Sequence, residues 1–280
     1  MSQSPPVVLT IAGFDPSSGA GVTADIKTIA AHSCYGLACI TALTVQSTQG
    51  VCRVEDISPR LIADSLANLA ADFEIAAVHV GMLGNAEAVQ AVVEFQKRLK
   101  LPLVLDPVLK SSSETSLLDD AGRRVLIGEL MPLAVVTTPN VDEAAAMTGL
   151  PVTNQLEMKA AATRLHEMGA TAVVITGGHL QPAVDLLSHI LNGKFEQEEF
   201  RTDHQSSRST HGTGCAFSSA LACNLALGKT LAEAVMLAKA YVTVAIAHGQ
   251  ALGRGIGPVH HLYRLDEGNL EKAKGRPKTA

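Results

Sequence analysis

The sequence contains no tryptophan, and aromatic residues make up only 3% of its 280 positions. Aliphatic side chains and alanine must therefore supply most of the core, for which an apolar content of 47% is ample. No run of 18 or more apolar residues is present, so we expect no association with a membrane through a spanning helix. Basic residues are not in excess either, and the net charge of -5 argues against sequence-independent nucleic-acid binding.

The cysteines exclude two further classes of protein. They number five, which is odd, and no two of them form a C-x-x-C pair. This spacing indicates neither a disulfide framework nor a zinc site, and it favours a reduced, cytoplasmic protein. The first six residues lack the basic and apolar segments of a signal peptide, so we expect none. The cysteines are Cys34, Cys39, Cys52, Cys215 and Cys223.

The chain does contain a regular alternation of short β-rich runs and longer helical patterns. This alternation predicts βαβ units and a central, mostly parallel sheet flanked by helices. Most strand runs are continuously aliphatic, which is typical of strands covered on both faces. The predicted strands are Val7–Ala12, Leu37–Leu43, Ala76–Gly81, Leu103–Asp106, Ala134–Thr138 and Ala172–Gly177. The predicted helices are Ala20–Ala31, Ser58–Ala71, Ala86–Leu99, Asp119–Glu129, Val141–Met147, Gln155–Met168, Thr213–Leu227 and Leu231–His248.

One segment departs from this alternation. Two β-rich runs, Ala183–Leu191 and Phe195–Phe200, flank Asn192-Gly193, which is a strong two-residue hairpin turn. We therefore predict a β-hairpin near residues 183–200, on the antiparallel side of the sheet. No linker divides the chain, so residues 1–265 are predicted to form one domain. The polar residues 266–280 are predicted to be a mobile C-terminal tail.

The most informative motif is Ser209-Thr210-His211-Gly212-Thr213-Gly214-Cys215, which leads into an alanine-rich apolar run. Its glycines let backbone N–H groups converge, and the positive end of a helix dipole adds to them. The motif therefore predicts an anion site, for example for phosphate. Cys215 closes the turn, where a thiol tends to have a lowered pKa. The alternative for the motif is a glycine-rich turn with a structural cysteine. His211 lies beside this turn and either orients it or faces solvent.

Other polar residues follow predicted strands, at the sheet edge where α/β proteins bind ligands. The loop Gly13–Gly21 follows the first strand and leads to a helix that carries Asp25, and Asp106 ends a buried strand. Asp25 could accept hydrogen bonds from an amine or a hydroxyl. The alternative for the loop is a tight turn in which Asp15 caps its own backbone.

Asn140 and Glu143 form a capping box in outline, at the start of a predicted helix. They could equally reach phosphate or a magnesium-bound water, since magnesium prefers oxygen ligands. Gln46 follows the second strand and could read a polar heterocycle, and Met82 could wall an apolar pocket. Each of these two residues could instead be an ordinary packing or surface residue.

Together these segments resemble hydroxymethylpyrimidine kinase/phosphomethylpyrimidine kinase of thiamine biosynthesis, a family of the ribokinase-like superfamily. They occur in family order from about residue 7 to residue 263, and their joint occurrence is far more specific than any one of them. The matching segments are Ile11–Gly21 with Asp25, Thr41–Leu43, Gln46, Gly81–Leu83, Asp106, Thr138–Asn140 with Glu143, Gly177–His179, Thr210–Cys215 and Gly253–His261.

The resemblance implies a three-layer α/β sandwich and an enzyme that uses ATP and Mg2+. Its substrate would be 4-amino-5-hydroxymethyl-2-methylpyrimidine and then the monophosphate of that compound, and the family favours a homodimer. By motif, the residues around the pyrimidine would be Gly13, Asp25, Gln46, Met82 and Val108. The transferring phosphoryl group would bind to Gly212, Thr213, Gly214 and Cys215. The nucleotide would contact Asn140, Thr176, Gly178 and Thr213, and magnesium would use Glu143 and Asp106.

Two positions bear directly on the chemistry that the resemblance implies. Cys215 stands where many sugar kinases of the superfamily have a catalytic aspartate, and we expect its thiolate to take the proton of the substrate hydroxyl. That role requires a pKa below the ordinary value of about 8.5. The family often has a lysine where this chain has Thr176, so the second phosphorylation is an open question.

The alternative functions are a pyridoxal kinase, which has a similar fold, and a non-catalytic pyrimidine sensor.

Overall fold

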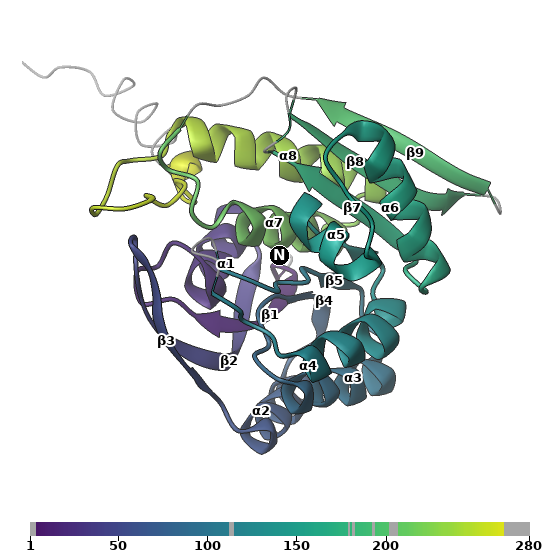
Figure 1. Ribbon diagram of the computed structural model, residues 1–280. Helices are drawn as coiled ribbons and strands as arrows, with labels where there is room; N and C mark the ends of the chain where they lie inside the picture. The colour runs from purple at the N-terminus through teal and green to yellow at the C-terminus, as the bar shows by residue number, and fades with distance from the viewer. Residues whose placement is uncertain are drawn as a thin grey trace, which may run out of the picture.

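A single mixed β-sheet runs through the molecule (Figure 1). The computed structural model describes residues 4–111, 115–178, 180, 183–191, 194–201 and 207–265, and all that follows concerns these residues. The strands lie in the order β3-β2-β1-β4-β5-β6-β7-β8-β9. They are β1 (Val7–Phe14), β2 (Tyr35–Ser47), β3 (Gly50–Asp56), β4 (Ile75–Val80), β5 (Leu103–Leu105), β6 (Val136–Thr137), β7 (Ala172–Gly177), β8 (Val184–Leu191) and β9 (Lys194–Arg201).

The six central strands, β2-β1-β4-β5-β6-β7, are parallel, and an antiparallel hairpin extends each side of the sheet. On one side β3 pairs with β2, and on the other β8 pairs with β7 and β9 with β8. The predicted parallel sheet and the hairpin near 183–200 are thus confirmed. The hairpin turn Asn192-Gly193, His179 and the tail 266–280 lie outside the described residues.

Helices cover both faces of the sheet (Figure 1). One face packs against α1, α7 and α8, and the opposite face packs against α2, α3, α4, α5 and α6. Aliphatic side chains of the strands fill both interfaces, as the low aromatic content requires. The predicted three-layer sandwich is confirmed. The helices are α1 (Gly21–Ala31), α2 (Pro59–Asp72), α3 (Ala86–Leu99), α4 (Asp120–Val125), α5 (Val141–Thr148), α6 (Gln155–Glu167), α7 (Thr213–Ala226) and α8 (Leu231–Ala247).

Three elements differ from the prediction. The strand β3 was not predicted, and β2 runs four residues beyond its predicted end at Leu43, so that Gln46 lies within a strand. The helix predicted over Asp119–Glu129 is α-helical only to Val125. A π-helical turn and a 3-10 turn follow, the latter containing Pro132, whose ring cannot continue an α-helix.

The parallel strands all end at the same edge of the sheet, and the loops that follow them gather there with the start of α7. Among the described residues, no helix has both the length and the apolar character that a membrane span requires.

Candidate active site

Gly212 brings the glycine-rich turn into close contact with the first loop of the chain. Its φ is 82°, a left-handed value that favours glycine, and a Cβ atom there would lie 1.8 Å from the carbonyl oxygen of Gly19. α7 begins at the next residue, Thr213. The N–H groups of Gly214 and Cys215 belong to its first turn, where N–H groups lack a partner within the helix. The turn therefore presents the donors and the dipole that an anion site needs.

The thiol of Cys215 lies among carboxylates at this turn. The residue is half-buried, but its sulfur is enclosed by protein atoms, and the Gly21 N–H donates a hydrogen bond to it. Burial raises the pKa of the thiol well above its usual range, and the negative charges of Asp25 and Asp106 raise it further. The hydrogen bond from Gly21 opposes this shift without reversing it. The expected lowering of the Cys215 pKa is therefore wrong, and the thiol is neutral.

Asp25 lies beneath the turn in a fully buried polar cluster. Its carboxylate accepts hydrogen bonds from the hydroxyls of Thr10 and Ser219, both at 2.6 Å. The Nδ1 atom of His79 is 3.4 Å from the same carboxylate. Burial favours neutral His79, but the charges of Asp25 and Asp106 outweigh it and raise the pKa of the imidazole. Both oxygens of Asp25 already have partners within the protein. Its role as a direct substrate ligand stays a prediction.

Asp106, just after β5, and Glu143, in α5, add two more carboxyl groups at the same edge, 5% and 8% exposed. Burial raises the pKa of Asp106 to about 6, with further repulsion from Asp25, while His79 opposes the shift. Burial raises the pKa of Glu143 to about 8, and repulsion from Asp106 is the next cause. Asp106 also adjoins the turn, since a Cβ atom at Gly214 would lie 3.6 Å from its Oδ2.

Three of the four residues predicted to contact the nucleotide lie near the ends of β6 and β7. Asn140 caps α5 in a complete capping box, in which it exchanges 2.9 Å hydrogen bonds with Glu143. The structural alternative for this pair is therefore confirmed, which does not prevent a ligand from sharing the site. Asn140 forms a β-bridge with Thr176, and exposed Gly178 follows two residues later. Three of the four predicted nucleotide contacts thus lie together, and the fourth, Thr213, is the first residue of α7.

A buried lysine lies behind this edge, although none occurs at position 176. The Nζ atom of Lys239, from α8, donates to Asp185 at 2.7 Å, and both side chains are buried. Asp185 is paired with Thr176 across the β7–β8 ladder and also accepts the N–H of Gly177. The charge of Lys239 is therefore neutralised, and Lys239 does not replace the missing lysine. Sequence reasoning missed this ion pair because its two members are 54 residues apart.

The predicted apolar wall of the pyrimidine pocket combines residues of β1 and β2 with residues of the loops that follow β4 and β5. Met82 packs with Ala42 and Leu117, and the half-buried Val108 packs against the same cluster. Gly13 faces Met82 so closely that a Cβ atom would lie 2.8 Å from its sulfur. Gly13, Met82 and Val108, each predicted from a separate segment, therefore lie side by side.

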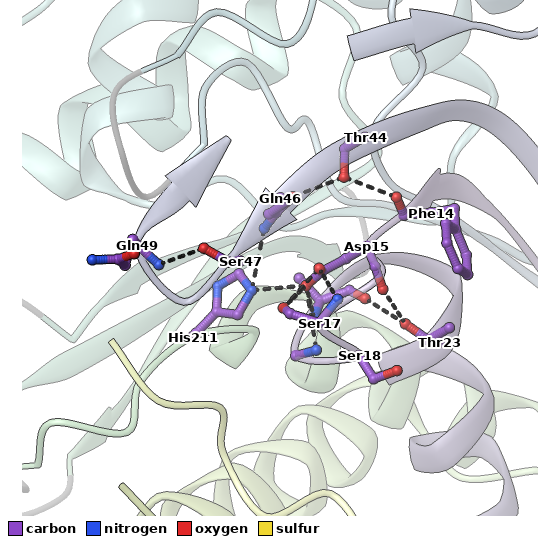
Figure 2. Close-up of polar contacts among 12 residues, drawn as sticks. Phe14, Asp15, Ser17, Ser18, Thr23, Thr44, Gln46, Ser47, Gln49 and His211 are labelled. Carbon is purple, nitrogen blue, oxygen red and sulfur yellow. Dashed lines mark hydrogen bonds and ion pairs between the residues drawn. The ribbon is translucent and has the colours of Figure 1, made fainter. Parts of the chain in front are cut away.

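Gln46 is connected to the glycine-rich turn through His211 (Figure 2). The amide of Gln46 is 3.3 Å from the Nε2 atom of His211, and that atom is 2.9 Å from Asp15. Asp15 also accepts hydrogen bonds from the backbone of Ser17 and Ala20, so its predicted capping of its own loop is confirmed. His211 is only 9% exposed, and the solvent-facing alternative for it is wrong.

Comparison with protein families gives a match over most of the chain. Residues 15–260 match the family described as phosphomethylpyrimidine kinase. A hydroxymethylpyrimidine/phosphomethylpyrimidine kinase of Rhizobium meliloti is 40% identical over 269 residues, which are 92% of this chain and 97% of that protein. The thiamine biosynthesis bifunctional protein ThiED of Geobacter sulfurreducens is also 40% identical, and the chain spans 53% of its length.

Solved structures give the same fold. The phosphomethylpyrimidine kinase of Clostridium difficile is 38% identical, with a TM-score of 0.74 over 86% of this chain and 99% of that one. The pyridoxal kinase of Staphylococcus aureus, solved with AMP-PCP and pyridoxal, is 32% identical, with a TM-score of 0.82 over 92% of this chain and 94% of that one. The matches in sequence and structure show that the chain is a phosphotransferase that belongs to the phosphomethylpyrimidine kinase family.

Proposed function

We propose that the protein transfers the γ-phosphoryl group of ATP to the hydroxymethyl group of 4-amino-5-hydroxymethyl-2-methylpyrimidine, and then phosphorylates the resulting monophosphate. The family membership supports this reaction. The observation that supports it best is the contact between the turn 212–215 and the first loop, near which Gln46 and the apolar wall also lie. In this proposal the turn binds phosphate and the neighbouring residues enclose a small ring.

Gly212, Thr213, Gly214 and Cys215 hold the transferring phosphoryl group in this proposal. Phosphoryl transfer depends mostly on positioning and on charge stabilisation, which fixed backbone donors supply. Cys215 is proposed to accept the proton of the substrate hydroxyl, which a neutral thiol cannot do. Magnesium held by Asp106 would offset one of the charges that raise the pKa of the thiol, whereas burial, the largest cause, would remain. The base role of Cys215 therefore requires that the thiol first release its proton to solvent, and we assign that role only to the enzyme with both substrates bound.

Gly13, Met82 and Val108 form the apolar side of the pyrimidine pocket, and Gln46 reads the amine and the adjacent ring nitrogen. Asp25 is also proposed to belong to the pocket, but it acts indirectly and not as a ligand of the ring. With its carboxylate held by Thr10 and Ser219, it positions the floor of the site.

The nucleotide is proposed to lie against Asn140, Thr176, Gly178 and Thr213. ATP is supported by the relatives solved with ADP and with AMP-PCP. Asp106 and Glu143 would hold Mg2+, because buried carboxyl groups with raised pKa values and oxygen donors suit a divalent cation. Magnesium bound there would offset the charge of the triphosphate. Among the described residues no three His, Cys, Asp or Glu side chains form a metal site by themselves, so phosphate and water oxygens would complete it.

Product analysis tests the proposal directly. The protein is incubated with ATP, magnesium and the pyrimidine alcohol, and ADP and the pyrimidine phosphates are measured by mass spectrometry. We expect ADP formation that depends on both the pyrimidine and magnesium, with monophosphate first and diphosphate second. Binding of the pyrimidine without any ADP would favour the sensor. Monophosphate as the final product would indicate that Thr176 does not support the second step.

We also propose that the protein is a homodimer, which gel filtration tests. We place the reaction in the cytoplasm.

A pyridoxal kinase is the second candidate, because the chain superimposes on the Staphylococcus aureus pyridoxal kinase over nearly its whole length. Both substrates are nitrogen heterocycles that carry a hydroxymethyl group. The comparison is between kcat/KM for the pyrimidine alcohol and for pyridoxal under the same conditions. A tenfold preference for pyridoxal would overturn the pyrimidine assignment.

A further inference from the structure

Three polar side chains from distant parts of the chain form a continuous series (Figure 2). Asp15 comes from the loop after β1, His211 from the loop before α7, and Gln46 from β2. The Nε2 atom of His211 is the common neighbour of the other two, at 2.9 Å from Asp15 and 3.3 Å from Gln46. Whether this nitrogen carries a proton decides which hydrogen bonds it can make with Asp15 and Gln46.

Asp15 determines that state. Its side chain is buried and surrounded by donors, which include the backbone N–H groups of Ser17 and Ala20. Burial pushes the pKa of Asp15 upward, but the hydrogen bonds from His211 and Ser17 outweigh it and hold the pKa below its usual value. An ionised carboxylate can only accept hydrogen bonds. The Nε2 atom of His211 therefore carries a proton and donates it to Asp15.

Gln46 must respond to this proton. As placed, its amide nitrogen faces His211 Nε2, so that two donors oppose each other. The nitrogen and oxygen of an amide have nearly the same shape, and the hydrogen bonds decide which is which. Rotation of the amide by half a turn places Oε1 against His211 Nε2–H, so that an acceptor replaces a donor there and the N–H is shared between Asp15 and Oε1.

Thr44 provides an independent check at the other end of the amide. Its hydroxyl is 3.0 Å from the carbonyl oxygen of Phe14 and 3.2 Å from the Oε1 atom of Gln46. The one hydroxyl proton is then divided between two acceptors, which weakens both hydrogen bonds. After the rotation Thr44 donates to Phe14 and accepts from the amide nitrogen of Gln46. One rotation thus gives Thr44 an undivided hydrogen bond to Phe14 and replaces the donor–donor contact at His211 with a donor–acceptor contact.

We propose that Asp15 and His211 are positioning residues that fix the orientation of the Gln46 amide, and that they thereby select a ring with an amine beside an unprotonated nitrogen. Each end of the amide keeps one bonding position, an acceptor on Oε1 and a proton on Nε2. A 4-aminopyrimidine offers the matching amine proton and ring lone pair. A pyrimidin-4-one offers the reverse arrangement, a carbonyl beside an N–H. The inference rests on the proposed function in that Gln46 contacts the ring.

Asp15→Asn is the first test. The measured quantity is the ratio of kcat/KM for the 4-amino substrate to kcat/KM for its 4-oxo analogue, followed as ADP formation. Two mismatched hydrogen bonds predict a ratio on the order of 100 for the unaltered protein. In Asp15→Asn the imidazole is free to carry its proton on either nitrogen, so the amide can turn, and we expect the ratio to fall at least tenfold, mainly through KM. An unchanged ratio in an active variant would overturn the proposal.

Two further variants separate positioning from a general loosening of the loop. His211→Gln keeps an N–H donor near the place of Nε2 and should retain most of the ratio, whereas His211→Asn is too short and should lose it. The matched control is His261→Gln, because His261 contacts Gly19 of the same loop at 3.1 Å. We expect the control to keep the ratio. A loss equal to that of Asp15→Asn would count against the proposal. This set also carries the test if Asp15→Asn fails to fold.

The protonation of His211 is measured separately by 15N NMR, with the imidazole signals assigned through the His211 variants. We expect a protonated Nε2 in the unaltered protein, and a bare Nε2 would overturn the proposal whether or not the enzyme turns over. If Nε2 is protonated but no ADP forms with the 4-amino substrate, the proposed function fails, and the selectivity fails with it, while the orientation of Gln46 is still supported. The two failures are therefore distinguishable.

Discussion

Removal of the ionisable group of Glu143 should make the protein more stable in alkaline solution. Glu143 is 8% exposed, and its carboxyl group has its pKa raised from 4.5 to about 8 by burial and by repulsion from Asp106. The folded protein therefore holds this proton more tightly than the unfolded chain does. The resulting stabilisation is complete below pH 4.5 and is lost as the pH rises through about 8. Glu143→Gln cannot ionise and keeps an oxygen to accept the N–H of Asn140.

The size of the effect follows from the shift in pKa. Each unit corresponds to about 1.4 kcal/mol, so the full shift of Glu143 corresponds to about 5 kcal/mol between the two limits of pH. The free-energy difference that Glu143 contributes alone is smaller, because Glu143 and Asp106 repel each other and do not ionise independently. We expect on the order of 2–5 kcal/mol, which is a difference in Tm of roughly 5–15 °C for a chain of this size.

The assay is thermal unfolding from pH 5 to pH 9 at constant ionic strength, without magnesium or nucleotide. The Tm of Glu143→Gln minus that of the unaltered protein should be near zero at pH 5 and should increase steadily toward pH 9. Asp142→Asn is the matched control, because Asp142 is the exposed neighbour at the start of the same helix. Its effect should be small and nearly independent of pH. A difference for Glu143→Gln that is flat with pH, or that has the opposite sign, would refute the reasoning.

Three further changes test other parts of the site. Cys215→Ala should lower kcat on the order of 100-fold or more, with the pyrimidine KM nearly unchanged, and an unaltered kcat would remove the thiol from proton transfer. Gly212→Ala should abolish ADP formation and lower Tm, because its Cβ would collide with the first loop. The control is Gly228→Ala, at a similar φ of 79° but in open space, which should lower Tm only through backbone strain and keep ADP formation. Lys239→Met should lower the free energy of unfolding by about 3–5 kcal/mol in urea titrations, and adding Asp185→Asn should recover part of that loss; additive losses would contradict a coupled pair.

The sequence was sufficient for the parts of the fold that have a strong local signal. The aliphatic strands and amphipathic helices were predicted because burial on both faces leaves a clear pattern in the chain. The strand β3 was missed because it is a mostly exposed edge strand whose pairing with β2 gives no such pattern. The π-helical turn after Val125 was also missed, since the periodicity of the segment continues past the point where the backbone changes.

For the site, the sequence placed single residues but not the interactions between them. Gly13, Met82 and Val108 were predicted separately and meet in one wall, because loops at the ends of parallel strands share one edge. The pKa of Cys215 was predicted in the wrong direction. The prediction used only the helix on which the thiol lies, whereas the shift comes from burial and from carboxylates on α1 and after β5. Such neighbours are set by tertiary structure.

The contact between His211 and Asp15 joins positions that are 196 residues apart in the chain. On the ribosome, the first loop is therefore made long before the segment that contacts it. A chain that ends before His211 lacks both this contact and the glycine-rich turn that we propose to bind phosphate, so we expect such a chain not to consume ATP.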